Sequence, residues 1–565
     1  MGATAMSQPR NHGLLVEKDV GIPMRDGTRI YSDVFRPDHT DEKVPAILNL
    51  GPYQKDKVWI PPADLEEEAN PYMAWEAINP MWWVPRGYAC VRIDTRGSGK
   101  SPGKSGPSSY EESLDLYDSI EWYAKQPWCN GRIGLCGISY HAAVQWRVAN
   151  LQPPSLKAIL PWEGRADQYR DQAYHGGIFA MGFLTNWHTA QVAHHLLGDA
   201  GENDPEPFNN NMLWHYMRHS LDDDYWKKIA ADWEKITVPL FTVGNWSGFA
   251  MHLRGNTEAY MNAASKNKKL RIHTGTHFHP FHAEEARIDQ LRWFDHWLKD
   301  IDTGIMAEPP VKLMIRTGGN KEPYQFRFED EWPIARTKWT KLYVNIDRPF
   351  SPAADSVEGR LLAEPPAQPQ SITYEASMPT RAGLVPTTAN AASAALHGRM
   401  GITLETEPMK ADTEITGPLM ANLWVSSTSK DMDIFITLRN VDAGGKDIWE
   451  SGQHGQPVPL TKGWLRASHR ELDPDKTLPY RPYHKHKQRL WLKPGEIVEC
   501  QVEIWPTSIV IAKGHRLRID IQPRDGVGSA PYTHYYADYN IQARNSIHSS
   551  KDMPSYVLLP IVPPK

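Results

Sequence analysis

Residues 131–146 read Gly-Arg-Ile-Gly-Leu-Cys-Gly-Ile-Ser-Tyr-His-Ala-Ala-Val-Gln-Trp, and the chain is organised around them. Asn130-Gly131 is a turn signal, and the apolar run from Ile133 to Ile138 predicts a short strand. Residues 142–150 favour a helix. Ser139 therefore falls on a strand-to-helix turn, which is where a nucleophile elbow exposes its hydroxyl.

The residues around Ser139 suit a catalytic hydroxyl but also allow a simpler interpretation. Gly137 supplies the small residue that a sharp turn requires. The amides that open the following helix carry partial positive charge and can hold an oxyanion. A Gly-x-Ser tripeptide is a weak signal on its own, because a serine at this place also caps helices.

The composition predicts a multidomain protein that does not bind nucleic acid. A chain of 565 residues exceeds what one core usually serves, so two or three domains are expected. The formal net charge is -5 and the charges are interspersed, which indicates no basic surface for a polyanion. The cysteines are expected to be buried free thiols, because they form no Cys-x-x-Cys pair. They are Cys90, Cys129, Cys136 and Cys500.

The chain carries no signal for a membrane location. Residues 1–17 lack the basic and apolar segments of a secretory leader, and no stretch reaches the about 18 continuous apolar residues of a membrane span. We expect a cytoplasmic protein with no membrane partner. The oligomeric state stays open, and a homo-oligomer is compatible with the sequence.

The first half of the chain alternates strands with helices, which predicts a doubly wound parallel sheet. An α/β domain is expected over residues 14–168 and again over 231–305. Between them, residues 169–230 are aromatic and helical, including His194-His195, and are expected to form a helical cap inserted into the sheet. The fold class is therefore α/β, with an insertion.

The second half has a different pattern. After Pro309 the chain shows short alternating apolar runs, beginning with Val311 to Ile315, separated by Pro, Gly and Asn. Helical periodicity is scarce there. We expect residues 309–565 to form an antiparallel β-sandwich of the jelly-roll type.

A set of residues in the order serine, acid, histidine supports acyl transfer. A nucleophile needs a base within hydrogen-bond reach and an acid that orients the base. Ser139 and His277 fit that order, since His277 follows a predicted strand. The neighbouring His273, His279 and His282 also allow a zinc site as a rival interpretation. We expect no metal and no cofactor.

Several motifs together resemble one family. The chain is similar to the cocaine esterase, X-prolyl dipeptidyl-peptidase and α-amino-acid ester hydrolase family of α/β-hydrolases, over nearly its whole length. The matching motifs in the first half are Met24-Arg-Asp-Gly-Thr28, Pro52-Tyr53 with Lys55, Asp94-x-Arg-Gly-x-Gly-x-Ser101, Gln126-Pro-Trp-x-Asn-Gly131, and Gly137-x-Ser-Tyr140 with Gln145-Trp146. Those in the second half are Glu414-Ile-Thr-Gly-Pro418, Asp431 with Asp433, Gly514-His-Arg-Leu-Arg518 and Pro554-Ser555, which resemble the C-terminal domain of X-Pro dipeptidyl-peptidases.

The resemblance implies roles for individual residues. Ser139 is expected to be the nucleophile and His277 the general base. The Tyr140 amide and the Tyr53 hydroxyl are expected to form the oxyanion hole. The implied function is that of a serine hydrolase acting on a small-molecule ester or amide.

The chain departs from the family at the acid. The family places an aspartate in Gly-Trp-Tyr-Asp, whereas the aligned stretch here ends in Ser247, whose hydroxyl cannot hold an imidazolium by charge. In some α/β-hydrolases the acid lies one strand earlier, where this chain has Glu163. We therefore predict Glu163 as the acid. Asp167 is expected to be structural, and Glu258 is a third choice.

The sequence ranks substrates without deciding between them. Carboxylic ester hydrolysis comes first, X-prolyl peptide or amide cleavage second, and amino-acid-ester or β-lactam acyl transfer third. The acidic run Asp64, Glu66, Glu67 and Glu68 could hold a substrate ammonium or form a solvated face. A hypothesis of another class is an inactive relative that binds carbohydrate through its β-sandwich.

Overall fold

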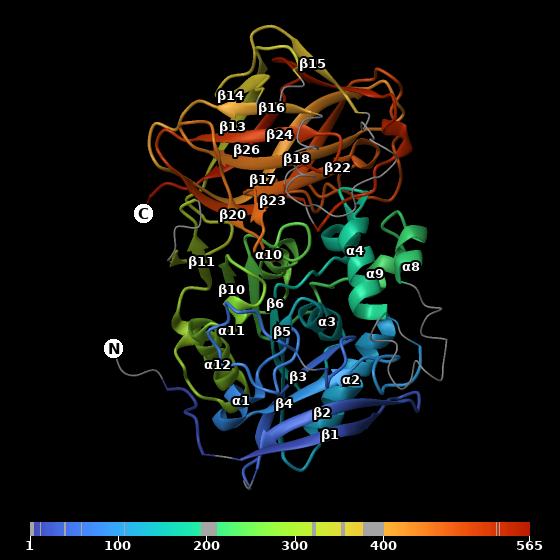
Figure 1. The fold of residues 1–565 in the computed structure, drawn as a ribbon, viewed down its shortest axis with the longest axis vertical. Helices are drawn as coiled ribbons and strands as arrows, with labels where there is room; N and C mark the ends of the chain where they lie inside the picture. The colour runs from blue at the N-terminus through green and yellow to red at the C-terminus, as the bar shows by residue number, and fades with distance from the viewer. Residues whose placement is uncertain are drawn as a thin grey trace.

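The computed structural model contains two large sheets with a helical insertion beside them (Figure 1). It describes residues 5–11, 13–38, 41–57, 59–104, 106, 108–193, 212–318, 324–351, 356–376, 401–526, 528–529 and 531–564. His194-His195 lies outside the described residues. No helix in the described part of the chain is both long and apolar enough to cross a membrane.

The first sheet has ten strands in the order β1-β2-β4-β3-β5-β6-β9-β10-β11-β12. Neighbours from β4 to β11 run parallel, and β1, β2 and β12 add antiparallel edges. The strands are β1 (Leu14–Pro23), β2 (Arg29–Pro37), β3 (Val44–Gly51), β4 (Ala89–Asp94), β5 (Cys129–Ile138), β6 (Leu156–Trp162), β9 (Leu240–Asn245), β10 (Lys268–His273), β11 (Val311–Ile315) and β12 (Gln325–Glu329). The central strands β3 and β4 are buried along their whole length, as a parallel sheet covered on both faces requires.

Helices cover this sheet, and their sequences account for where they begin. The main ones are α2 (Tyr110–Ala124), α3 (Tyr140–Ala149), α10 (Leu253–Asn262) and α12 (Glu284–Lys299). The Ser109 side chain caps α2 by accepting a hydrogen bond from the Glu112 amide. The α/β-hydrolase fold class predicted from the sequence is confirmed. All four cysteines are buried and free, as expected.

The insertion after β6 carries short helices. Its described elements include the hairpin β7 (Tyr174–His175) and β8 (Ile178–Phe179), the helices α4 (Met181–Trp187), α8 (Met212–Arg218) and α9 (Asp224–Ile229), and π-helical turns at Tyr169–Ala173 and His188–Val192. Figure 1 shows α4, α8 and α9 grouped on one side of the molecule, between the two large sheets. Trp187 and Tyr216 are buried in the same core as the hydrolase sheet.

The second sheet has 12 strands and closes on itself. Most neighbours are antiparallel, and β17 pairs with β23 and β25 and also with β26, the last strand of the order, which closes the ring. The long strands are β17 (Thr413–Ser427), β23 (Val498–Ile511) and β18 (Asp433–Val441). The others are β13 (Lys338–Ile346), β14 (Gly359–Leu362), β15 (Gln370–Glu375), β16 (Ile402–Thr406), β19 (Asp447–Ile448), β22 (Thr461–Arg466), β24 (Arg516–Gln522), β25 (Arg544–Ser549) and β26 (Tyr556–Ile561). This closed, barrel-like β-sandwich surrounds its own apolar core.

One strand lies in a different sheet from the one predicted. Val311 to Ile315 was expected in the C-terminal sandwich, but as β11 it pairs in parallel with β10 and extends the hydrolase sheet. An alternating apolar run fits either sheet, so its pattern cannot choose between them. Val311 and Leu313 belong to an apolar cluster between the two halves of the molecule. Trp464 and Trp505 of the second half belong to the same cluster.

Candidate active site

Ser139 stands at the sharp turn between β5 and α3. Strand β5 ends at Ile138, helix α3 begins at Tyr140, and Ser139 has φ 55° and ψ -105°. This positive φ is strained for a residue with a side chain, and such strain is typical of a nucleophile elbow. A Cβ at Gly137 would come within 2.6 Å of His141 Cβ, which explains the glycine.

The nearest imidazole to the Ser139 hydroxyl belongs to His252. Ser139 Oγ lies 3.1 Å from His252 Nε2, and both residues are buried. His252 immediately precedes α10, in the loop after β9. Sequence reasoning missed it, although it comes five residues after Ser247, in the loop where the family acid was sought.

Glu163 and His277 are brought together. Glu163 follows β6 with φ 51° and is fully buried. His277 Nδ1 lies 2.7 Å from Glu163 Oε2, and the Asn245 amide donates to Glu163 Oε1 at 3.0 Å. Burial would raise the pKa of Glu163, but the nearby imidazoles outweigh it and lower that pKa to about 2. Glu163 is therefore an anion at neutral pH.

His277 lies between two carboxylates. Its Nε2 is 3.1 Å from Glu76 Oε1, opposite the contact with Glu163. Burial lowers the pKa of His277, but the charge and hydrogen bond of Glu163, followed by those of Glu76, raise it to about 10. Among the described residues, Ser139 and His277 are not hydrogen-bonded to each other; the serine faces His252.

Glu76 is a second residue that the sequence did not indicate. It belongs to the aromatic-rich segment after β3, has φ 58° and is 3% exposed. Its backbone carbonyl accepts from the Ile138 amide, which holds it against the elbow. Glu76 Oε2 is buried and has no hydrogen-bond partner among the described residues.

Gln453 connects the two imidazoles to the C-terminal half. It lies between β20 (Glu450–Ser451) and β21 (Pro457–Val458), a turn that reaches down to α10 in Figure 1. Gln453 Nε2 donates to Glu163 Oε2 and lies 3.0 Å from His252 Nδ1. The rings of His252 and His277 are nearly parallel, with centroids 5.4 Å apart. Burial and the charge of His277 hold the pKa of His252 well below its usual value.

The two residues expected at the oxyanion hole flank the elbow. Tyr140 is the first residue of α3, so its amide is one of the helix-opening groups. The ring of Tyr53 packs edge-on against those of Tyr140 and His141. The Tyr53 hydroxyl accepts from Trp187 Nε1 at 3.1 Å. Burial raises the pKa of Tyr53 well above its usual value, which keeps the phenol a proton donor.

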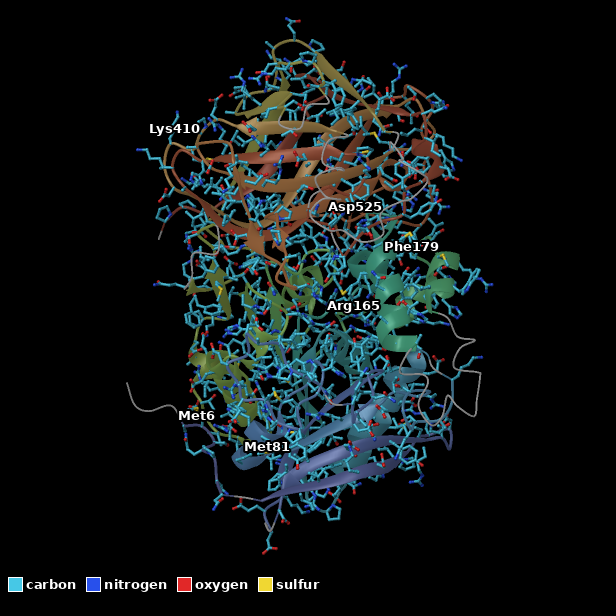
Figure 2. The ribbon with its side chains drawn as sticks, viewed as in Figure 1. Met6, Met81, Arg165, Phe179, Lys410 and Asp525 are labelled. Atoms are coloured by element: carbon cyan, nitrogen blue, oxygen red, sulfur yellow. The ribbon has the colours of Figure 1, made fainter. Side chains whose placement is uncertain are left out.

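A cavity of about 230 Å³ lies beside Tyr53. Its walls combine the aromatic rings of Trp59 and Trp75 with His141 from the elbow helix and the backbone of Gly51. In Figure 2, Arg165, two residues after Glu163, lies near the middle of the molecule, below Asp525 and above Met81. Gln453 of the C-terminal half contacts Glu163 and His252, so the site lies where the two halves meet.

The other carboxylates considered from the sequence have different partners. Asp167 forms an ion pair with Arg170, and Glu258 pairs with Arg481 of the C-terminal half. Ser247 Oγ donates to the Ser451 carbonyl at 2.6 Å.

The acidic run is largely held by the protein itself. Asp64 accepts from the Thr276 hydroxyl, Glu66 pairs with His279 and Glu67 pairs with His282. The four histidines do not converge on one point, which does not fit the zinc site considered from the sequence. His273 and His277 both contact Glu163, whereas His279 and His282 contact Glu66 and Glu67.

A different set of residues offers ligand atoms close together. Atoms of Glu163, His252 and His277 lie within 4.8 Å of one another. The amide of Gln453 already donates to the carboxylate and faces His252 Nδ1, and an N–H donor between these atoms is incompatible with a cation bound by both. The donor set therefore fits a hydrogen-bond network better than a metal.

Two family models and several curated proteins match this chain. Residues 26–279 match the model of the X-Pro dipeptidyl-peptidase (S15 family), and residues 303–558 match that of the X-Pro dipeptidyl-peptidase C-terminal non-catalytic domain. Cocaine esterase of Rhodococcus sp. is 26% identical, covering 97% of this chain and 98% of its own length. A putative serine esterase of Mycobacterium bovis is 24% identical over 96% of this chain and 95% of that protein.

A solved structure is similar over almost the whole chain. A CocE/NonD family hydrolase from Staphylococcus aureus superposes with a TM-score of 0.84 and 29% identity, covering 97% of this chain and 94% of that one. The two matched models together span most of the chain, and the relatives are named esterases, peptidases and hydrolases. The chain is a hydrolase that belongs to the S15 family, which includes cocaine esterase and the X-Pro dipeptidyl-peptidases.

Proposed function

We propose that this protein hydrolyses carboxylic esters through an acyl-enzyme formed on Ser139. One observation carries the proposal: the Ser139 hydroxyl is held on a strained turn against a buried imidazole, beside the Glu163–His277 pair. A nucleophile, a base and an orienting acid are the groups that acyl transfer requires.

We assign the general base to His277 rather than to His252. A base must be stabilised once it has taken the proton, and Glu163 stabilises an imidazolium at His277 directly. A proton added to His252 Nδ1 would face the N–H of Gln453, so that ring cannot be charged at low cost. In acylation, His277 Nε2 exchanges Glu76 for the Ser139 hydroxyl and takes its proton.

The oxyanion would be held by the Tyr140 amide and the Tyr53 hydroxyl. Ser139 attacks the ester carbonyl, and the negative charge that develops on its oxygen is stabilised by these donors. The alcohol leaves with the proton from His277, and water then releases the acyl group by the same steps. The aromatic cavity beside Tyr53 suits an apolar substituent of the ester.

A second candidate, hydrolysis of esters or amides that carry a free amine, is favoured by Glu76. This carboxylate lies at His277 with one oxygen lacking a partner among the described residues, and an ammonium would supply one. Relatives named putative Xaa-Pro dipeptidyl-peptidases, such as that of Bacillus anthracis at 26% identity over 53% of this chain, agree with an amine-bearing substrate.

The test of the ester hydrolase is labelling with a fluorophosphonate, followed by peptide mapping of the protein and of Ser139→Ala. We expect one adduct on Ser139 that is absent from the variant, together with turnover of p-nitrophenyl esters. No adduct and no turnover would contradict the proposal. In that case measurable binding to a glycan array would favour the inactive carbohydrate-binding relative.

The second candidate is tested by comparing kcat/KM for amino-acid esters with a free amine and with a blocked amine. Preference for the free amine that disappears in Glu76→Gln would support it. Equal rates on the two substrates would assign the protein to ordinary esters.

A further inference from the structure

His252 touches the reacting oxygen and has no role in the assignment above. Its ring is 2% exposed, and Nε2 lies 3.1 Å from Ser139 Oγ. The question is which of the two atoms carries the hydrogen between them. If Nε2 is bare, His252 competes with His277 as the base; if Nε2 carries the proton, it donates to the serine oxygen.

The orientation of the Gln453 amide determines which atom carries this hydrogen. Its Nε2 has two hydrogens: one points to Glu163 Oε2, and the other faces His252 Nδ1 at 3.0 Å. The Tyr532 hydroxyl donates to Gln453 Oε1 at 3.2 Å, so both ends of the amide are satisfied. The reversed amide would place its oxygen against an anionic carboxylate, which is repulsive.

The tautomer of His252 follows from this orientation. Because Gln453 donates to Nδ1, Nδ1 is bare, and the single proton of the neutral ring lies on Nε2. A second proton is opposed by burial and by the neighbouring His277 cation, and Glu163 is 3.9 Å away rather than in contact. His252 is thus a neutral imidazole that donates from Nε2 to Ser139 Oγ.

We propose that His252 is a second catalytic residue, a neutral imidazole whose Nε2–H stabilises negative charge on Ser139 Oγ, in a tautomer fixed by Gln453 of the C-terminal half. The inference rests on the proposed serine hydrolase function. It gives the C-terminal half a direct part in the active site. The backbone carbonyl of Gln453 also accepts a hydrogen bond from the backbone N–H of His277 at 2.9 Å.

The proton count is the same before and after each step. In acylation the O–H bond of Ser139 breaks, its proton goes to His277, and the oxygen electron pair forms the bond to the carbonyl carbon. His277 then gives this proton to the departing alcohol as the bond between the carbonyl carbon and the alcohol oxygen breaks. In deacylation water attacks the acyl carbon and gives a proton to His277; the bond to Oγ then breaks, its electron pair returns to Oγ, and His277 reprotonates it. His252 keeps its proton throughout and lowers the energy of both states in which Oγ is negative.

Two substitutions at this position separate a donor from a base. His252→Gln keeps an N–H that can reach Ser139 but cannot accept a proton, whereas His252→Leu keeps neither. We expect kcat/KM for a p-nitrophenyl ester to fall by about 10²-fold to 10³-fold in His252→Leu, the scale of losing one oxyanion donor. In His252→Gln it should stay within about tenfold of the parent, and Ser139 labelling rates should follow the same order.

Two results would overturn the role of His252. Equal losses of about 10⁴-fold in both variants would make His252 the base. An unchanged kcat/KM in His252→Leu would make it a bystander. If the parent protein itself gives no Ser139 adduct, the proposed serine hydrolase fails instead, so the two failures are distinguishable.

A measurement independent of activity tests the tautomer. In protein labelled with ¹⁵N-histidine at pH 7, the signals missing from His252→Gln identify His252. We expect Nε2 to be protonated and Nδ1 to be bare in the parent, and Gln453→Met to relax that preference. A protonated Nδ1 and a bare Nε2 in the parent would overturn the proposal even if every variant were inactive.

Discussion

Two imidazoles lie side by side in this site and have opposite electrostatics. His277 and His252 are both buried, with nearly parallel rings whose centroids are 5.4 Å apart. The pKa of His277 is raised to about 10, and that of His252 is held well below its usual value. The first contacts two carboxylates, and the second contacts a serine hydroxyl and an amide.

The groups in contact with each imidazole, rather than burial, decide which ring is charged. Loss of water disfavours the imidazolium at both positions. Only His277 has an anion at each nitrogen, and its charge then opposes a second charge on His252. In the proposed mechanism, one base and one neutral donor arise from identical side chains, in the way that environment separates paired acids in other enzymes.

The largest effect should come from removing the charge of Glu163, which makes the pKa values of the two imidazoles differ. Glu163→Gln keeps the shape of the side chain but cannot stabilise an imidazolium at His277. We expect kcat to fall by about 10⁴-fold, as for the loss of an orienting acid elsewhere. Steady-state kinetics and the rate of Ser139 labelling measure it, and a loss of less than about tenfold would contradict the assignment.

The next largest loss of kcat is expected from removing a hydrogen-bond donor to the carbonyl oxygen of the substrate. If His252 and His277 both serve Ser139, separate donors must hold the oxyanion, and we propose the Tyr53 hydroxyl together with the Tyr140 amide. Tyr53→Phe should lower kcat by about 10²-fold with little change in KM, because the interaction is made in the transition state. An unchanged kcat would remove Tyr53 from the oxyanion hole.

Part of this arrangement can be read from the sequence. The elbow at Ser139 is encoded locally by a strand, a turn and a helix, so the stretch 131–146 was sufficient to place it. The doubly wound sheet and the C-terminal sandwich follow from the change in periodicity near residue 309. Glu163 and His277 each follow a strand, and the carboxyl ends of parallel strands share one edge of the sheet. The resemblance to the family selects His277 from its cluster, and the serine at position 247 directs the search for an acid to Glu163, one strand earlier.

The remaining site residues are brought together by long-range contacts, which no local sequence pattern predicts. Ser139 and His252 are 113 residues apart in the chain, and Gln453 and Glu163 are 290 residues apart. Gln453 lies on a turn of the other half, and Glu76 lies in an irregular loop. A glutamine or glutamate in such segments has no distinguishing spacing, so only the folded chain brings them to the nucleophile.

A smaller effect, of the opposite sign, is expected from the second carboxylate at His277. Only neutral His277 can accept the serine proton, and its raised pKa keeps it charged at neutral pH. The kcat/KM of the free enzyme should therefore rise with pH toward about 10. Glu76→Gln should lower the pKa of His277, move this rise to lower pH and increase kcat/KM at pH 7. The increase should be about tenfold for each pH unit by which the midpoint of the rise falls.

The matched control is Glu66→Gln. Glu66 pairs with His279, and its side chain is 55% exposed, so this variant should keep the parent profile. A flat parent profile through pH 7–10, or a profile that Glu76→Gln leaves in place, would show that His277 is not the titrating base.

The smallest effect is expected at Ser247, the position where the family has its acid. Ser247 Oγ donates to the Ser451 carbonyl, and its backbone amide donates to Asn245 Oδ1. Ser247→Ala keeps the amide bond but loses the hydroxyl's bond to the Ser451 carbonyl and its long 3.4 Å contact with the Thr274 hydroxyl, at a cost of about 1 kcal/mol in stability. Asn245 keeps its contact with Glu163, so kcat should change by no more than about threefold, the scale of a remote substitution.

The stronger form of this test asks whether position 247 can still supply an acid. An aspartate there would face the carbonyl that Ser247 now contacts, which repels a carboxylate. We therefore expect Ser247→Asp not to restore activity to Glu163→Gln. Recovery of kcat in the double variant to within about tenfold of the parent would show that the acid can act from either strand. The difference in charge between the two imidazoles would then depend on the presence of an anion near His277, and not on Glu163 itself.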